Sequence, residues 1–214
     1  YVGVYPTDPL AFSLTPASIT DVAIKYGKST GIVTSDSIMG ATPASFSAHV
    51  RDRDLAEDIF AQQVVSEIDL IWGAITETVT VSEVEANGKE YVDSLADVQA
   101  LEPGQKSIGQ FECNALWQGI VNGDQPTLSE LTIEALELLS ADEDGFFLMV
   151  EGAHIDKRSH DQDGDGARTA VLEFDKAVSA VLDFAEENGN TLVIVTADHE
   201  TGSVTKQDDG SYKW

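Results

Sequence analysis

The stretch from Ala170 to Thr196, AVLEFDKAVSAVLDFAEENGNTLVIVT, carries the two patterns that decide the fold. Up to Asn188, apolar side chains recur every three or four positions with acidic side chains between them, which predicts an amphipathic helix. Asn188-Gly189-Asn190 ends that pattern, and the apolar run from Thr191 to Thr196 shows no alternation. Such a run is typical of a parallel strand that helices cover on both faces. The stretch therefore predicts a helix followed by a buried strand.

The same helix-then-strand unit recurs earlier in the chain. The further units expected are a helix over 18–26 with a strand over 30–34, a helix over 54–67 with a strand over 69–73, and a helix over 127–140 with a strand over 146–150. Asn87-Gly88 marks either a hairpin or a helix end, and we favour the helix end. The predicted fold class is α/β, with a mostly parallel central sheet and helices on both faces, and residues 1–214 are expected to form a single domain.

Composition narrows the classes of function. Twelve Lys and Arg residues against 38 Asp and Glu residues give a net charge of −26. Because so acidic a surface repels a phosphate backbone, we expect no nucleic-acid partner. No window reaches the roughly 18 apolar residues of a membrane span, and the first residues lack the basic leader and apolar run of a signal peptide. We therefore expect neither feature within this sequence.

Histidines and carboxylates gather just after two of the predicted strands. Residues 151–160 follow the strand over 146–150, and residues 197–202 follow the strand over 191–196. Open parallel sheets bind their ligands beyond the carboxyl ends of the strands. The two segments are therefore expected to meet at one edge of the sheet.

The spacing within these segments suits a metal ion. Asp156 and His160 are four positions apart, so on a helix both face one side. Asp198 and His199 are adjacent, and they converge where the backbone bends at a strand end. Mixed carboxylate and imidazole ligands suit zinc or another borderline metal. The alternative for each histidine is a surface or hydrogen-bonded core position.

Three segments together resemble the signatures of the alkaline phosphatase family. EGAHIDKRSH at 151–160 and TADHETG at 196–202 resemble its paired metal-binding motifs, and ATPASFSAHVRDR at 41–53 resembles a third signature. KSTGIVT at 28–34 resembles the strand that precedes the third signature. The resemblance covers nearly the whole chain in one order, and it implies a phosphomonoester hydrolase of which this chain is the central portion of a larger domain.

The resemblance implies two zinc ions and one magnesium ion, held by carboxylate, imidazole and hydroxyl side chains. The ligand pairs it implies are Asp156 with His160 for the first zinc, Asp198 with His199 for the second zinc, and Thr42 with Glu151 for magnesium.

Two basic residues match positions that contact phosphate in the family. Arg53 would grip the substrate, because a guanidinium fork binds two phosphate oxygens at once. Its alternative is a surface salt bridge with Asp52 or Asp54. Lys157 matches a position that in some relatives contacts phosphate, or the third metal through water.

The family reaction uses a serine that becomes phosphorylated while two metal ions clamp the attacking and leaving oxygens. No Asp-Ser-Ala motif occurs in the sequence, and the serines near the third signature lack an evident activating partner. Matches for an early bridging aspartate and a late zinc-binding histidine are missing as well. The resemblance thus implies a nucleophile outside this chain, and we expect the isolated chain to have little or no activity.

Other interpretations remain open. The same scaffold could act on phosphodiesters or sulfates, because related sites support several chemistries. An interpretation of a different class is a noncatalytic, acidic metal-binding module. The resemblance further implies small phosphate monoesters as substrates, a homodimer, and a periplasmic or extracellular location.

One acidic loop resembles the start of a calcium-binding loop. DQDGDG at 161–166 matches the start of a calcium loop, but position twelve of that loop is Leu172, where a bidentate acid is required. We expect no EF-hand here, and we interpret the loop as a surface insertion before a helix that begins near Ala170. Cys113, the one cysteine, is expected to be a buried thiol.

Overall fold

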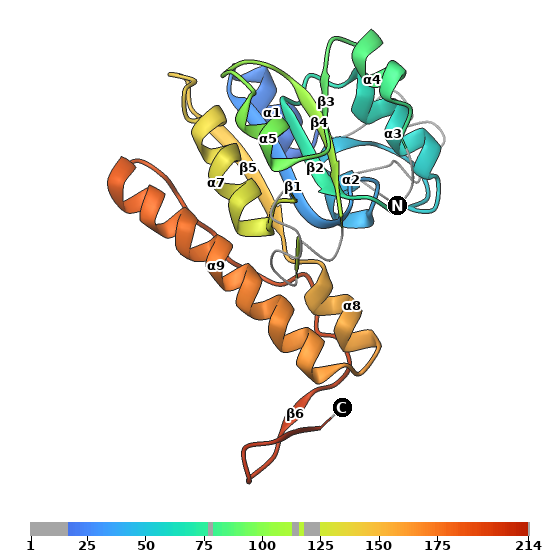
Figure 1. The fold of residues 1–214 in the computed structure, drawn as a ribbon, viewed down its shortest axis with the longest axis vertical. Coiled ribbons are helices and arrows are strands. Elements are labelled where there is room, and N and C mark those ends of the chain that lie inside the picture. Colours follow the sequence, from blue (N-terminus) through green and yellow to red (C-terminus); the bar gives the residue numbers. More distant parts are fainter. Residues whose placement is uncertain (1–16, 77–78, 113–115, 118–124, 214) are drawn as a thin grey trace.

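The computed structural model of the protein describes residues 17–76, 79–112, 116–117 and 125–213. Its helices and strands alternate along most of the chain, as Figure 1 shows. In order they are α1 (Ile19–Lys25), β1 (Ser29–Ser37), α2 (Ala41–Ser47), α3 (Ala56–Val65), β2 (Leu70–Ala74), α4 (Val81–Ala86), β3 (Glu90–Val92), α5 (Leu95–Gln99), β4 (Ser107–Phe111), α7 (Leu128–Leu139), β5 (Phe146–Glu151), α8 (His154–His160), α9 (Gly164–Asn188), β6 (Thr205–Lys206) and β7 (Tyr212–Lys213).

The central sheet has five strands in the order β3-β4-β2-β1-β5, and every neighbouring pair is parallel. This confirms the predicted α/β class. From β1 the chain adds β2 and then β3 at the outer edge, places β4 between β3 and β2, and returns to place β5 on the opposite side of β1. The order of the strands therefore reverses between β1 and β5, and such a reversal opens a crevice at the carboxyl ends of the two strands.

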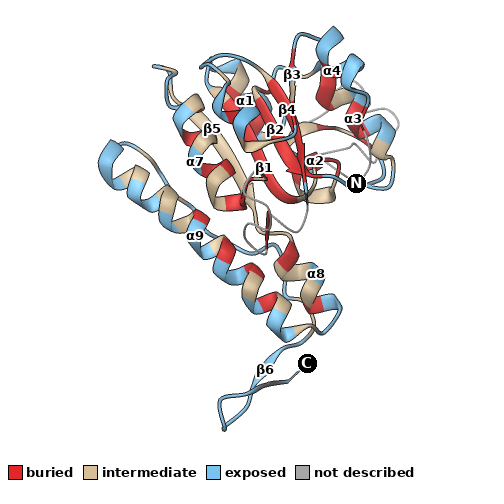
Figure 2. Ribbon diagram, viewed as in Figure 1, coloured by how far each residue is buried: buried red, intermediate tan, exposed pale blue. Residues whose placement is uncertain are grey.

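Alternating strand residues supply two cores, one on each face of the sheet. Ile32 and Ile71 pack with α2, α3 and α4 on one face. Val33 and Trp72 pack with α5, α7 and α9 on the other. In Figure 2 the buried positions concentrate in these strands, whereas most of α9 and the chain beyond it are exposed. Helices thus cover both faces, as the sequence predicts.

Several local predictions are confirmed at the level of individual caps. Thr127 and Glu130 form both arms of the capping box that opens α7. Asn87 is the C-cap of α4, and Gly88 follows with a φ of +74°, so Asn87-Gly88 ends a helix and does not turn a hairpin. No described helix is both long enough and apolar enough to cross a membrane.

The prediction of a strand over Thr191–Thr196 is wrong. These residues form neither strand nor helix, and Leu192 and Ile194 are 85% and 76% exposed. No backbone hydrogen bond within the described chain joins them to β5, which is the edge strand of the sheet. An apolar run indicates a tendency to be buried, but a strand also requires a hydrogen-bonded neighbour.

The loop at 161–166 also differs from its prediction. It is not an insertion before a helix at Ala170, because α9 begins at Gly164. Asp163 is the N-cap residue of α9, and its carboxylate accepts a hydrogen bond from the backbone N–H of Gly166. The aspartate spacing that imitates a calcium loop therefore serves here as a helix start. The prediction for Cys113 lies outside the described residues.

Candidate functional site

The site is built at the carboxyl ends of the neighbouring strands β1 and β5. Thr34 and Glu151 are direct neighbours in the register of these two parallel strands, near the carboxyl end of each. The Thr34 hydroxyl donates a hydrogen bond of 2.5 Å to Oε2 of Glu151. The backbone N–H of Asp36, two residues further along β1, donates to the same hydroxyl at 3.2 Å. The pairing of the strands thus fixes the position of the Glu151 carboxylate.

Glu151 is an acid in an environment that opposes its ionisation. Burial raises the pKa of its carboxyl group, and the nearby carboxylates of Asp36 and Asp198 raise it further, while hydrogen bonds from Thr34 and Thr42 lower it. The net pKa lies above the ordinary value. A bound cation would remove this penalty, and carboxylate and hydroxyl oxygens are ligands that suit magnesium.

The raised pKa of Glu151 gives a prediction about stability and pH. A carboxyl whose pKa is higher in the folded state contributes stability that is full below its unfolded pKa and is lost as the pH rises through the folded pKa. We therefore expect Glu151→Gln to raise the melting temperature of the metal-free protein at pH 7. We also expect this gain to vanish below about pH 4, where both states of the native residue are protonated.

Thermal unfolding from pH 3 to pH 8 measures this effect. Thr34→Val is the matched control, because it removes a hydrogen bond that favours the ionised carboxylate and should lower the melting temperature at pH 7. An equal melting temperature for Glu151→Gln and the native protein at pH 7 would contradict the raised pKa.

Helix α8 carries the first predicted zinc pair. Asp156 and His160 lie on α8 as expected, with 3.5 Å between Oδ1 of Asp156 and Nε2 of His160. Both side chains are open to solvent. The helical spacing therefore brings the two groups together on one side of α8, as the sequence predicts.

The second predicted zinc pair, Asp198 and His199, lies in the extended chain after α9. Nε2 of His199 lies 3.2 Å from Oδ2 of Asp198. The Thr201 hydroxyl donates a short hydrogen bond to Oδ1 of Asp156 and lies 3.1 Å from Nδ1 of His199. The Asp198 carboxylate also contributes to the raised pKa of Glu151. The residues after α9 therefore lie near both α8 and the end of β5.

Lys157 is held beside this cluster by an acid that the sequence analysis missed. Its Nζ lies 2.6 Å from Oδ1 of Asp36, and the Asp36 side chain is largely buried. The signal that could have identified Asp36 is its place at the end of β1, but the strand was expected to stop at Thr34. Thr201 was missed as well, because a lone hydroxyl has no characteristic spacing.

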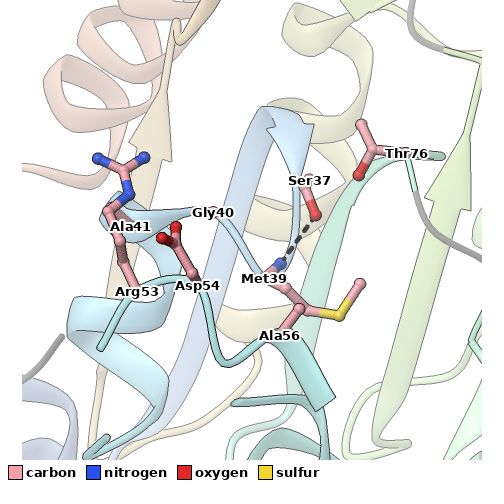
Figure 3. Close-up of a pocket in the computed structure, with 8 residues that line it drawn as sticks. All are labelled: Ser37, Met39, Gly40, Ala41, Arg53, Asp54, Ala56 and Thr76. Carbon is pink, nitrogen blue, oxygen red and sulfur yellow. Dashed lines mark hydrogen bonds between the residues drawn. The ribbon is translucent and has the colours of Figure 1, made fainter. Parts of the chain in front are cut away.

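Arg53 lies in the loop between α2 and α3. Its side chain is exposed, and it forms no ion pair with Asp52, Asp54 or any other described residue. With Asp54 it borders an open cavity of about 350 Å³, shown in Figure 3. The remaining lining residues are Ser37, Met39, Gly40, Ala41, Ala56 and Thr76.

This cavity lies near the carboxyl ends of two strands. Ser37 is the last residue of β1, Thr76 follows β2, and Ala41 precedes Thr42 at the start of α2. Arg53 therefore faces a space of the kind in which open parallel sheets bind ligands.

The donor groups fit the metals that the resemblance implies. Two carboxylate–imidazole pairs suit zinc, and the oxygens of Glu151 and Thr42 suit magnesium. Within the described ranges, no three His, Cys, Asp or Glu side chains converge closely enough to hold an ion. The structure thus supplies pairs of donors of the right chemistry, linked through Thr201 and Glu151.

Comparison with known proteins gives one consistent result. The family model described as "Alkaline phosphatase" matches residues 13–73 and 73–214. Alkaline phosphatase 3 of Bacillus subtilis (strain 168) is 36% identical over 210 residues, which cover 92% of this chain and 45% of that protein.

Solved structures agree in fold. The cold-active alkaline phosphatase of the psychrophile Shewanella sp. superposes with a TM-score of 0.83 at 34% identity, over 92% of this chain and 50% of that one. The alkaline phosphatase of the Antarctic bacterium TAB5 gives a TM-score of 0.72 at 28% identity, over 92% of this chain and 61% of that one. The chain spans about half the length of the relatives it matches. By sequence and by fold, it belongs to the alkaline phosphatase family.

Proposed function

We propose that this chain supplies the metal-binding and phosphate-binding part of a phosphomonoester hydrolase of the alkaline phosphatase type. Family membership supports the class of enzyme. The single observation that carries the assignment is the Thr201 hydroxyl, which contacts Asp156 on α8 and His199 beyond α9. Two segments that are distant in sequence meet through this hydroxyl.

In this proposal the described residues hold two zinc ions and one magnesium ion. The assigned donors are Asp156 and His160, Asp198 and His199, and Glu151 and Thr42. When bound, the metals supply Lewis-acid stabilisation of the oxygens that attack and leave phosphorus. A variant of the TAB5 enzyme was solved with magnesium bound, which supports this choice of ion for a relative with the same fold.

Arg53 and Lys157 are the proposed contacts to phosphate. The Arg53 guanidinium has no ion-pair partner in the described chain, so its donors are free to bind two phosphate oxygens side by side. Lys157 is held by Asp36 near Glu151, where its ammonium group adds positive charge to a strongly acidic neighbourhood. The two cations would orient a dianionic substrate.

Phosphate binding tests the role of Arg53. We expect Arg53→Ala to weaken the affinity for inorganic phosphate about tenfold to a hundredfold, since a charge-assisted bidentate contact is lost. Arg53→Lys should recover only part of this loss, because an ammonium group cannot form the fork. The measurement is isothermal titration of the zinc- and magnesium-loaded protein.

Arg51→Ala is the matched control, because Arg51 is also exposed but borders a different cavity. Unchanged phosphate affinity in Arg53→Ala would refute the assignment of Arg53. Zinc binding without phosphate binding in the native protein would favour a metal-binding module, and faster cleavage of phosphodiesters or sulfate esters would favour the same-scaffold alternatives.

We further propose small phosphate monoesters as substrates, a homodimer, and a periplasmic or extracellular location. Family membership is the support for all three. Residues 1–214 would then act as one part of a larger phosphatase domain. Size-exclusion chromatography and cell fractionation test the assembly and the location.

A further inference from the structure

A buried stack of side chains secures the helix that carries Asp156 and His160. The indole ring of Trp117 lies against the imidazole ring of His154, with 4.9 Å between the ring centroids and 5° between the planes. The guanidinium carbon of Arg158 lies 4.3 Å from the centre of the same indole. Trp117 and His154 are each only 3% exposed. One indole therefore contacts two residues of α8.

Trp117 contacts the side of α8 that faces away from the predicted zinc ligands Asp156 and His160. His154 and Arg158 are four positions apart and lie on one side of the helix. Asp156 and His160 are each displaced from them by two positions, which is a rotation of about 200° around the helix axis. The exposure agrees, since Asp156 and His160 are open to solvent whereas His154 is buried. Fixing one side of α8 thus sets the direction in which the other side points.

The stack is also tied to the elements on either side of α8. Nδ1 of His154 lies 3.4 Å from the hydroxyl of Ser35, a buried residue of β1. Nη1 of Arg158 lies 3.8 Å from carboxylate oxygens of Asp161 and of Asp163, the N-cap residue of α9. The stack therefore connects α8 to the sheet and to the start of α9. Figure 1 shows α8 between these two parts of the fold.

Tertiary contacts of this kind decide the orientation of so short a helix. α8 has seven residues, and an isolated helix of that length is not stable in water. Nε1 of Trp117 and Nε of Arg158 are buried without a hydrogen-bond partner in the described chain. The faces of the indole and guanidinium groups, and not those two N–H groups, therefore make the contact.

We propose that Trp117, His154 and Arg158 are positioning residues that set the rotation of α8 and thereby the zinc affinity of Asp156 and His160. This inference rests on the zinc-binding roles proposed above. Residues that orient metal ligands from outside the ligand set contribute about tenfold to a hundredfold to metal affinity. The indole is the component that both α8 residues share.

Zinc titration against a competing chelator, at a temperature well below all melting transitions, tests the proposal. We expect Trp117→Leu, which keeps apolar volume but removes the flat face, to weaken zinc binding about tenfold. Trp117→Phe keeps an aromatic face and should stay within about twofold of the native affinity. Ile59→Val shortens a buried side chain on α3, so it should lower the melting temperature and leave the zinc affinity unchanged.

If Trp117→Leu does not fold, the zinc affinity of Arg158→Gln tests the proposal instead. The Arg158 side chain is partly exposed, so the protein should tolerate its loss. Native zinc affinity in Arg158→Gln and in any folded Trp117→Leu protein overturns the proposal. An equal loss of affinity in Ile59→Val overturns it too, because the effect would then be general destabilisation. Absence of zinc binding by the unmodified protein overturns both this inference and the proposed zinc sites, whereas native zinc affinity in every variant overturns this inference alone.

Discussion

Asp156→Ala is expected to weaken zinc binding by more than about a hundredfold. The residue contributes one of two donors at its proposed site, and even partners that only orient a ligand contribute tenfold to a hundredfold. The substitution also removes the acceptor of the Thr201 hydrogen bond, so the segment that carries His199 loses this hydrogen bond to α8. Both proposed zinc sites should therefore be affected by one change.

Equilibrium dialysis with zinc measures this loss directly. Asp175→Ala is the matched control, since Asp175 is an exposed carboxylate on α9 with no hydrogen bond or ion pair in the described chain. The control should bind zinc like the native protein. If Asp156→Ala also retains the native stoichiometry and affinity, the metal site is elsewhere and the proposed function loses its main support.

Thr201→Val separates the two consequences of that substitution. It keeps the Asp156 carboxylate and the shape of residue 201 but removes the hydroxyl that contacts Asp156 and His199. A smaller loss of zinc affinity than in Asp156→Ala is the expected order. A loss as large as that of Asp156→Ala would mean that the link between the segments matters more than the carboxylate as a ligand.

The parts of the site that the sequence predicts are those governed by local spacing. The four-residue separation of Asp156 and His160 requires only that α8 be a helix, and a helix is specified by contacts between near neighbours. Helix caps follow the same logic, as the Thr127–Glu130 capping box shows. Such features can be predicted from the sequence because they depend only on residues that are near neighbours in the chain.

The parts that the sequence does not predict depend on pairing between distant segments. Thr34 binds Glu151 because β1 and β5 pair in one register, and their separation of 117 positions leaves no local pattern. The strand prediction for Thr191–Thr196 fails for a related reason, because a strand needs a partner that no local pattern reveals. Its apolar run satisfies the local rule for a buried strand, but the described sheet ends at β5 without pairing to it.

The contact between β1 and β2 gives the second large prediction. A Cβ atom on Gly73 of β2 would lie 2.5 Å from the backbone oxygen of Asp36 and 2.8 Å from Cγ2 of Thr34. Both neighbours belong to β1, and a backbone oxygen cannot rotate away. We expect Gly73→Ala to lower the free energy of unfolding by about 3 kcal/mol, at the upper end of the cost of overpacking a core.

The same substitution should also damage the site, because the two residues it displaces are those that hold Glu151 and Lys157. The measurements are urea unfolding for stability and the rise of melting temperature with added magnesium for the site. Gly109→Ala on β4 is the comparison, since its Cβ would meet the rings of Phe111 and Trp72 at 2.9 Å, far from Glu151 in the strand order.

Gly109→Ala should lose stability but keep the native response to magnesium, whereas Gly73→Ala should lose both. Native stability in Gly73→Ala would show that β1 and β2 do not approach as closely as the structure has them. An equal magnesium response in the two variants would mean that the β1–β2 contact does not position Glu151. The packing of Gly73 in the sheet and the proposed binding of a cation at Glu151 would be coupled because both act on the same stretch of β1.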